Sequence, residues 1–176
     1  MKYIYYFLVS ILLAGCYAEK HDVQRTETSR SHKKLDNNKS VYISVSHDGR
    51  YGTILYHDSG IMTTQAIKMA LSKHVDSIIT DKRTTEDYGT ALKNAKSKKV
   101  SYLFYPQILE WEDRATEWSG KPDKVTIKIR VVDVKSNKNI SSIVLKSNSS
   151  WLTLGGDHPQ DLLEKPISDY INSLYN

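Results

Sequence analysis

The stretch VTIKIRV, residues 125–131, decides the fold, because its apolar residues alternate strictly with polar ones. A period of two is typical of an antiparallel strand with one face buried and the other in water. The polar run at 135–139 predicts a hairpin turn, and residues 140–151 predict the returning strand. Residues 100–112 predict the strand before it, in which Pro106 indicates an edge position or a β-bulge.

The rest of the chain predicts helices that alternate with two short strands. The strands are expected at 41–45 and 77–80, where β-branched residues gather. Apolar residues recur with a helical period after Ile61, after Tyr88 and from Leu163 to the C-terminus. The predicted order is β-α-β-α-β-β-β-α, which indicates an α+β two-layer sandwich with a mixed sheet and helices on one face.

Two local patterns predict where the first two helices begin. Ser59 or Thr63 can cap the first helix with a side-chain oxygen. Thr84 and Asp87 have the spacing of a capping box, with Asp in place of Glu, at the start of the second helix.

The N-terminus has the pattern of a bacterial lipoprotein signal. Residues 8–16 read LVSILLAGC, an apolar run that ends in Leu-Ala-Gly before the only cysteine, Cys16. Lys2 supplies the positive start and residues 3–13 the apolar region, which is too short to span a bilayer. Cleavage before Cys16 and acylation of this residue would anchor the chain in a membrane. The alternative is an ordinary secretory signal that is cut elsewhere.

The signal divides the chain into three expected parts. Residues 1–15 are the signal peptide, 16–40 the lipidated cysteine with a polar, flexible tether, and 41–176 a single periplasmic α+β domain. Tyr17 follows the cysteine in place of the Asp that retains enteric lipoproteins in the inner membrane. We therefore expect the outer membrane, with the domain facing the periplasm.

Composition excludes several classes of function. The chain has 25 Lys and Arg against 20 Asp and Glu, and these charges are interspersed, so no nucleic-acid-binding stripe is predicted. A single cysteine allows no disulfide within the chain. Twelve Tyr and three Trp suit half-buried strands and binding surfaces.

The motifs do not indicate an enzyme or a cofactor. His47, His57 and His158 lie in loops without the close spacing of metal ligands, so no metal site is predicted. The carboxylates between Glu110 and Glu117 are neighbours in sequence, unlike the paired acids of glycosidases, and salt bridges explain them more simply.

The most distinctive segment is 111–122, in which two Trp flank a charged run. Exposed Trp beside Arg and carboxylates is typical of a protein or glycan contact surface. The alternative is structural, with the indoles folded onto the sheet. The segments 48–52 and 155–159 are possible neighbours in space. The candidate interaction surface is Arg50, Tyr51, Trp111, Arg114, Trp118, Asp157 and His158.

Four segments together resemble a known family: the lipobox, 48–52, 111–122 and 155–163. They resemble the bacterial lipoprotein family known as domain of unknown function 4823, over nearly the whole mature domain. The resemblance implies a proteobacterial envelope lipoprotein and brings no established activity or catalytic residues.

The element order is also similar to that of small periplasmic α/β domains. These are the amino-terminal domain of the Tol translocation protein, the lipoprotein activators of penicillin-binding proteins, and curli-secretion-like lipoproteins. Members of this group bind partner proteins or assemble into envelope machines, although fold does not fix function. The chain lacks the transmembrane hairpin signal of a curli-type pore.

These observations predict a non-enzymatic, membrane-anchored module that binds an unidentified envelope protein. A second hypothesis is a glycan or peptidoglycan binder that uses the same aromatic and basic groups. A third is an unrecognised hydrolase, which requires Asp157 and His158 to converge with His47 or His57.

Overall fold

The alternating stretch forms β7, a strand in the interior of a six-stranded sheet. The computed structural model describes residues 22–30, 34–114, 122–149 and 158–176. Its elements are β1 Asp22–Arg30, β2 Val41–Val45, β3 Arg50–Tyr51, β4 Ile54–Leu55, α2 Ser59–Leu71, β5 Ile78–Thr85, α3 Tyr88–Ser97, β6 Tyr102–Glu112, β7 Lys124–Asp133, β8 Lys138–Asn148 and α4 Glu164–Tyr175. Among the described residues, no helix is long and apolar enough to cross a membrane.

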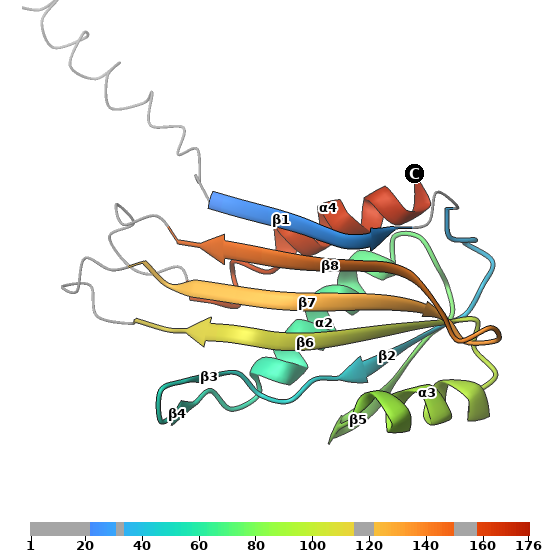
Figure 1. Cartoon of the computed structure of the whole chain (residues 1–176), viewed down its shortest axis with the longest axis horizontal. Coiled ribbons are helices and arrows are strands. Elements are labelled where there is room, and N and C mark those ends of the chain that lie inside the picture. Colours follow the sequence, from blue (N-terminus) through green and yellow to red (C-terminus); the bar gives the residue numbers. More distant parts are fainter. Residues whose placement is uncertain (1–21, 31–33, 115–121, 150–157) are drawn as a thin grey trace, which may run out of the picture.

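The sheet is mixed, and its strand order is β1-β8-β7-β6-β2-β5 (Figure 1). β2 runs parallel to both β5 and β6, whereas β6, β7 and β8 form an antiparallel meander, and β1 pairs antiparallel with β8 at one edge. β3 and β4 form a separate two-stranded hairpin. The predicted α+β class and the predicted order of the main elements are confirmed.

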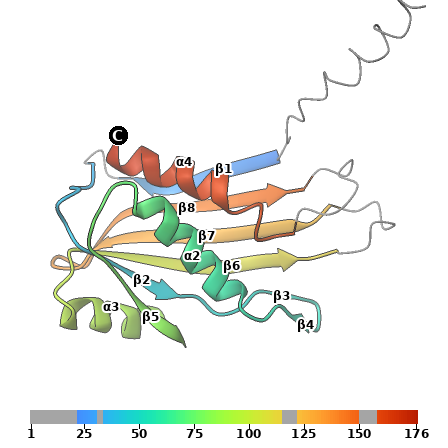
Figure 2. The ribbon, with the colours of Figure 1, turned by 180° about the vertical axis from the view of Figure 1, so that it is seen from behind.

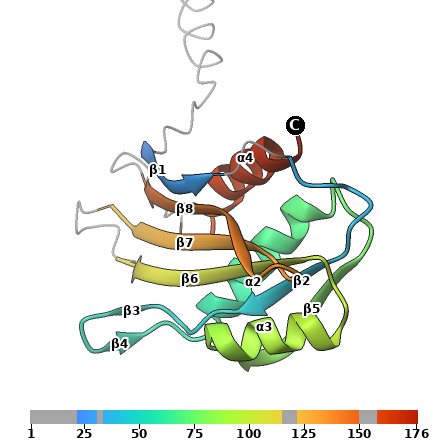
Figure 3. The same ribbon diagram turned by 45° about the vertical axis from the view of Figure 1, so that its right-hand side comes forward.

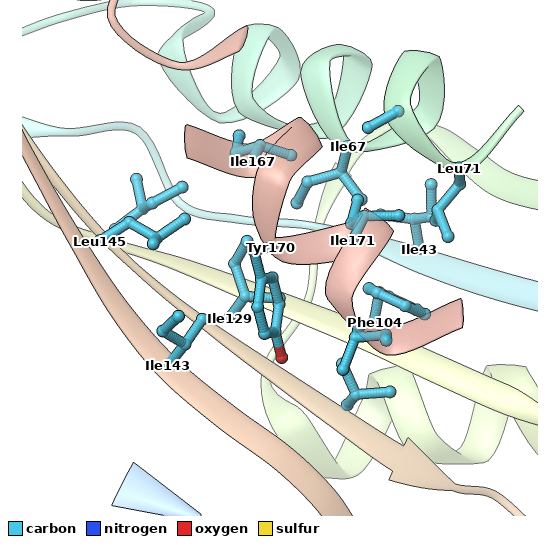
Figure 4. Close-up of a cluster of buried hydrophobic side chains, with 14 of the residues drawn as sticks. Ile43, Ile67, Leu71, Phe104, Ile129, Ile143, Leu145, Ile167, Tyr170 and Ile171 are labelled. Atoms are coloured by element: carbon cyan, nitrogen blue, oxygen red, sulfur yellow. The ribbon is translucent and has the colours of Figure 1, made fainter. Parts of the chain in front are cut away.

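Helices cover both faces of this sheet. α2 and α4 pack on one face, where the main core lies (Figures 2 and 4). This core contains inward-facing residues of β7 and β8 together with Ile167, Tyr170 and Ile171 of α4. α3 packs on the opposite face against a second cluster that includes Tyr42 and Leu103 (Figure 3). The expectation that all helices share one face is therefore wrong for α3.

Both faces are apolar near β2, which explains the position of α3. Val41 and Ile43 point into the core beneath α2, and the intervening Tyr42 points into the cluster beneath α3. A parallel strand buried on both faces reads as a nearly continuous apolar run rather than as an alternation.

The segment expected to be a tether contains a strand. β1 pairs antiparallel with β8, from Asp22 opposite Asn148 to Arg30 opposite Ser141. Leu35, further along the same segment, is buried in the main core, and its N–H donates to the carbonyl of Leu174 at 2.9 Å. The prediction of a flexible tether over 16–40 is therefore wrong for these residues. The open side of β8 accepts β1 although the sequence of β1 is polar.

Pro106 occupies a position where β6 has a strand on one side only. It pairs with Ile129 of β7, whereas the pairing between β6 and β2 ends at Phe104. The missing N–H of proline therefore breaks no ladder between β6 and β2. The predicted edge position is confirmed locally, although β6 as a whole is an interior strand.

The predicted helix caps differ from those in the structure. Asp87 is itself the N-cap of α3, where its carboxylate accepts a hydrogen bond from the N–H of Thr90 at 2.7 Å. This bond is the main reason why the pKa of Asp87 lies below its usual value. Neither Ser59 nor Thr63 caps α2, which begins after Asp58 without a cap from that residue.

Candidate functional site

The structure brings several of the predicted surface residues together at one end of the sheet. Arg50 and Tyr51 form β3 of the short hairpin, and Arg114 follows the end of β6. The guanidinium carbon of Arg114 lies 5.9 Å from the ring centroid of Tyr51. The Nδ1 atom of His158 lies 3.6 Å from Oδ2 of Asp113, the residue before Arg114. Three segments that are distant in sequence thus meet at this point. Trp118 and Asp157 lie outside the described residues.

Trp111 does not belong to the exposed surface. Its side chain is only 2% exposed and packs in the main core beneath α2 and α4. The cause is a β-bulge between Ile108 and Glu110, where the register of β6 against β7 shifts by one residue. The shift places Trp111 opposite Val125, so that both residues face the core. The prediction of Trp111 as a contact residue is wrong, and the structural alternative describes it.

Residues that come before and after the hairpin in sequence attach it to the sheet by hydrogen bonds. The N–H of Gly49 donates to Oγ of Ser59 at 2.8 Å, and this hydroxyl donates to the carbonyl of Tyr56 at 2.7 Å. The N–H of Tyr56 donates to the carbonyl of Gly49 at 3.0 Å. The phenol of Tyr56 lies 3.3 Å from both the N–H and the carbonyl of Asp113. These bonds close the loop at its base and hold β3 and β4 in place.

Asp48 ties the same loop to the start of α2. Its carboxylate accepts hydrogen bonds from the N–H groups of Gly60, at 2.9 Å, and Asp58, at 3.3 Å. The unpaired N–H groups at the start of a helix are usually bound by the side chain of the N-cap residue. In α2 they are bound instead by Asp48, which lies ten residues before the N-cap, Asp58. A side chain at Gly60 would overlap the carbonyl of Ser46, so glycine is needed at this close approach.

A buried carboxylate organises the charges beside Tyr51. Glu112 is buried and forms an ion pair with Arg114, while the ammonium group of Lys124 lies 3.9 Å from its other oxygen. Burial raises the pKa of Glu112, but the hydrogen bonds from Arg114 and Tyr51, together with the charges of Arg114 and Lys124, outweigh it, and the pKa is lowered overall. The hydrogen bond to Glu112 raises the pKa of Arg114. Both groups are therefore charged at neutral pH, and Arg114 is held in one orientation against the Tyr51 ring.

Two exposed apolar residues complete this end of the molecule. Ile54, in β4, is 54% exposed and lies opposite Tyr51, which is 46% exposed. Leu109, at the bulge of β6, is 55% exposed. We call Tyr51, Ile54, Leu109 and Arg114 the hairpin surface. The sequence analysis missed Ile54 and Leu109, although an isoleucine within the polar loop at 47–60 is a signal that could have identified the first.

A second polar cluster lies beneath α3. The phenol oxygen of Tyr42 lies 2.7 Å from Oδ2 of Asp81 and 2.8 Å from Oε2 of Glu86. Asn94 donates to Glu86, and Lys98 forms an ion pair with Asp81 at 3.5 Å. Burial and the two carboxylates raise the pKa of Tyr42 well above its usual value, so this phenol remains protonated. The cluster joins β2, β5 and α3 and has a structural role.

The described residues contain no group of three or more His, Cys, Asp and Glu side chains placed to hold a metal ion. The hydrolase hypothesis depends on Asp157, which lies outside the described residues. The side chain of His158 is half exposed, and its ring faces Asp113, while its backbone N–H donates to the carboxylate of Asp161 at 3.0 Å.

A groove of about 510 Å³ runs between the outer sides of α2 and α4. Met62 and Met69 line it from α2, and Gln160 and Glu164 line it from the other side. It lies on the helical layer, and none of its lining residues belongs to the hairpin surface.

Comparison with solved structures identifies the fold. An L103M variant of PelC from Paraburkholderia phytofirmans, a dodecamer, is similar at a TM-score of 0.63 and 14% identity, over 88% of this chain and 99% of that one. The lipoprotein GNA1162 from Neisseria meningitidis is similar at 0.52 and 13% identity, over 77% and 96%. Protein XCC0632 from Xanthomonas campestris is similar at 0.52 and 8% identity, over 83% and 89%. Identities this low establish a shared fold alone.

Comparison of the sequence with protein families is more specific. No curated protein matches the chain significantly. The model of the domain of unknown function DUF4823 matches residues 33–174, which include every element from β2 to β8 and all of α4 except its last residue, Tyr175. The chain therefore belongs to the DUF4823 family.

Proposed function

We propose that this protein is a lipid-anchored module of the outer membrane that faces the periplasm and binds another envelope protein without catalysing a reaction. The lipobox pattern that ends at Cys16 supports the anchor. The similarity in fold to a protein named as a lipoprotein supports a location in the cell envelope.

The observation that carries the binding role is the hairpin surface. Tyr51, Ile54 and Leu109 expose large apolar side chains. Ile54 lies opposite Tyr51 in the hairpin, and the ring of Tyr51 lies beside the guanidinium of Arg114. Tyr and Arg are enriched among the residues that dominate binding energy at protein interfaces, and exposed apolar side chains that gather beside them are typical of an interaction site.

Part of this surface is held in place before a partner arrives. Glu112 holds Arg114 beneath the ring of Tyr51, and the bonds of Gly49 and Tyr56 close the base of the hairpin. Side chains that are already ordered lose little conformational entropy on binding, which favours affinity. The buried carboxylate supports the surface from below, and the partner would contact Tyr51 and Ile54 directly.

The test places a photoreactive amino acid at Thr53, the exposed residue between Gly52 and Ile54 in the hairpin turn. We expect one dominant protein adduct in intact cells that express the full-length chain. Ile54→Asp should abolish this adduct, because a carboxylate replaces the exposed apolar contact. The matched control is Met69→Asp, since Met69 is 61% exposed on α2, away from the hairpin, and should leave the adduct unchanged.

Two outcomes would refute the binding role of this surface. One is a folded protein that gives no protein adduct from position 53. The other is an adduct whose yield is the same with Ile54→Asp as with Met69→Asp.

A glycan-binding role is the second candidate, and the outward face of the sheet supports it. Lys128 and Lys146 lie on the face of β7 and β8 opposite the main core, on strands whose alternate residues are buried. Peptidoglycan carries carboxylates that these ammonium groups could attract. Retention of the purified protein on isolated sacculi, lost on Lys128→Glu, would favour this candidate over a protein partner.

A further inference from the structure

The groove between α2 and α4 exposes apolar side chains on the helical layer (Figure 2). Met62, Ala66 and Met69 line it at the spacing i, i+4 and i+7, which places them on one side of α2. Met69 is 61% exposed and Met62 is 37% exposed. Among the described residues, the exposed large hydrophobic side chains belong either to the hairpin surface or to this groove. Apolar side chains that line a groove together are typical of a docking site for another helix.

The two charged residues that line the groove have opposite signs and lie toward its opposite ends. They are Lys73 and Glu164. α2 and α4 run in the same direction (Figure 2), and Nε2 of His74, just after α2, lies 2.8 Å from Oδ1 of Asn172 near the end of α4. Glu164 begins α4, so it lies toward the end of the groove where the helices start, and Lys73 lies toward the end where they finish.

A second copy of the chain provides a counter-charge for both groups. When two copies face each other across their grooves with α2 antiparallel, Lys73 of each copy lies toward Glu164 of the other. A two-fold axis relates the two contacts, so one complementary pair forms twice. A parallel arrangement would bring Lys73 to Lys73 and Glu164 to Glu164, and like charges repel. The charges therefore select the antiparallel arrangement.

The other side chains of α2 in the groove suit close contact with a second helix. Ala66 and Ala70 are small, and the distance between packed helices depends on the side chains at the contact, so a second α2 can approach closely there. Methionine is unbranched and flexible, so Met62 and Met69 can fill the gaps on either side of the alanines.

The opposite wall of the groove argues against a lipid acyl chain as the occupant. This wall is formed by polar residues: Gln160, Glu164 and Ser168. An acyl chain offers no hydrogen-bond partner, and burying polar groups without partners costs free energy. A protein surface supplies apolar contacts for the two methionines and a counter-charge for Glu164.

We propose that this groove is a self-association surface, through which two copies dock with their α2 helices antiparallel and Lys73 of each copy beside Glu164 of the other. The lining residues are separate from the hairpin surface, so a dimer leaves that surface free for a partner. Exposed ion pairs contribute little free energy, and the apolar contact is small, so we expect a weak, reversible dimer. Anchoring in one membrane, as proposed above, would favour it by raising the local concentration.

The first experiment crosslinks the full-length protein in intact cells. Gln65→Cys places a thiol at an exposed position of the groove, and a short bifunctional maleimide joins two such thiols. We expect a crosslinked dimer on a denaturing gel, identified as two copies by mass spectrometry. The matched control is Lys93→Cys, an exposed position on α3 at the opposite face of the sheet, which should give far less dimer. The unsubstituted chain measures any product that comes from Cys16.

Two outcomes of this experiment would overturn the proposal. One is an equal dimer yield from the two positions, or no dimer from Gln65→Cys. The other is a crosslink from Gln65→Cys to a different protein in place of a second copy, which would assign the groove to another partner.

The second experiment exchanges the charges in the Gln65→Cys background. Lys73→Glu and Glu164→Lys should each lower the dimer yield several-fold, because each homodimer then opposes like charges. Co-expression of the two variants, distinguished by tags of different size, should restore the dimer as a heterodimer, since each Glu again faces a Lys. This recovery distinguishes lost docking from misfolding, and failure to recover would refute the antiparallel arrangement.

The third experiment separates this proposal from the binding role of the hairpin surface. Met69→Asp in the Gln65→Cys background should lower the dimer yield several-fold, because a carboxylate replaces an exposed apolar contact in the groove. The same substitution should leave the partner adduct from position 53 unchanged. An unchanged dimer yield would refute docking through the groove, whereas a lost adduct would count against the hairpin surface as the separate partner site.

Discussion

Gly49 lies so close to Trp111 that a Cβ atom on the glycine would overlap the Cβ of the tryptophan and come within 2.9 Å of Cγ2 of Ile108. The loop that carries the hairpin therefore rests directly on β6. The buried indole of Trp111 supports the hairpin surface from below instead of forming part of it.

Gly49→Ala should consequently destabilise the protein. The added methyl group has no space between two elements that are fixed by the core, and overpacking of this kind costs about 1–3 kcal/mol. Urea unfolding followed by tryptophan fluorescence would measure the loss in the free energy of unfolding. An unchanged midpoint would show that the loop can move away from Trp111.

Gly89→Ala should have the opposite effect. Gly89 lies in α3, and the nearest atom to a Cβ placed there is Oδ1 of Asp87 at 3.5 Å, an ordinary van der Waals distance. Alanine restricts the unfolded chain and favours the helix, so the free energy of unfolding should rise by about 0.4–1 kcal/mol. The same urea titration checks this result, and a lower midpoint would contradict the geometry described for α3.

Asp48→Ala should weaken the start of α2. The substitution removes the acceptor for the N–H groups of Gly60 and Asp58, and the loss of a helix cap costs about 0.5–2 kcal/mol. Asp48→Asn is the matched control, because its single side-chain carbonyl can still accept the shorter of the two bonds, from the N–H of Gly60. Amide hydrogen exchange at the first turn of α2 should increase for the alanine variant and change little for asparagine. Equal exchange in the two variants would contradict a capping role for Asp48.

The ion pair between Glu112 and Arg114 predicts a dependence of stability on pH. The folded state lowers the pKa of Glu112 below its ordinary value of 4.5, so the stabilisation is complete above that value and is lost as the pH falls through the folded-state pKa. Glu112→Gln should cost about 1–3 kcal/mol at pH 7. The difference from the unsubstituted protein should shrink as the pH drops below 4.5. Thermal unfolding at several pH values would show this, and a difference that is constant with pH would contradict it.

Local patterns were sufficient for most of the main elements. The alternation at 125–131 predicted β7, because side chains on a strand point alternately to the two faces regardless of what lies further away. The helical period predicted α4 for the same kind of reason. By contrast, β1 has an almost wholly polar sequence, so it carries no such pattern, and its strand depends on the open edge of β8.

In the candidate site too, some features follow from the local sequence and others depend on the tertiary structure. Sequence alone identified Tyr51, Arg114 and His158 as distinctive, because aromatic and charged residues between turn residues are visible without a structure. Their meeting at one end of the sheet depends on the order of the strands, which joins segments about 40 to 60 residues apart through contacts that no local pattern contains.

By itself, the sequence determined the lipoprotein signal pattern, the α+β class and the positions of the strands and helices that have strong periodicity. Only the tertiary structure decided which side of β6 receives Trp111. A bulge of one residue reverses the faces of all side chains that follow it, and whether a bulge forms depends on the register with β7. The sequence therefore determined which residues are distinctive, whereas long-range pairing decided which are buried as support and which are exposed for contact.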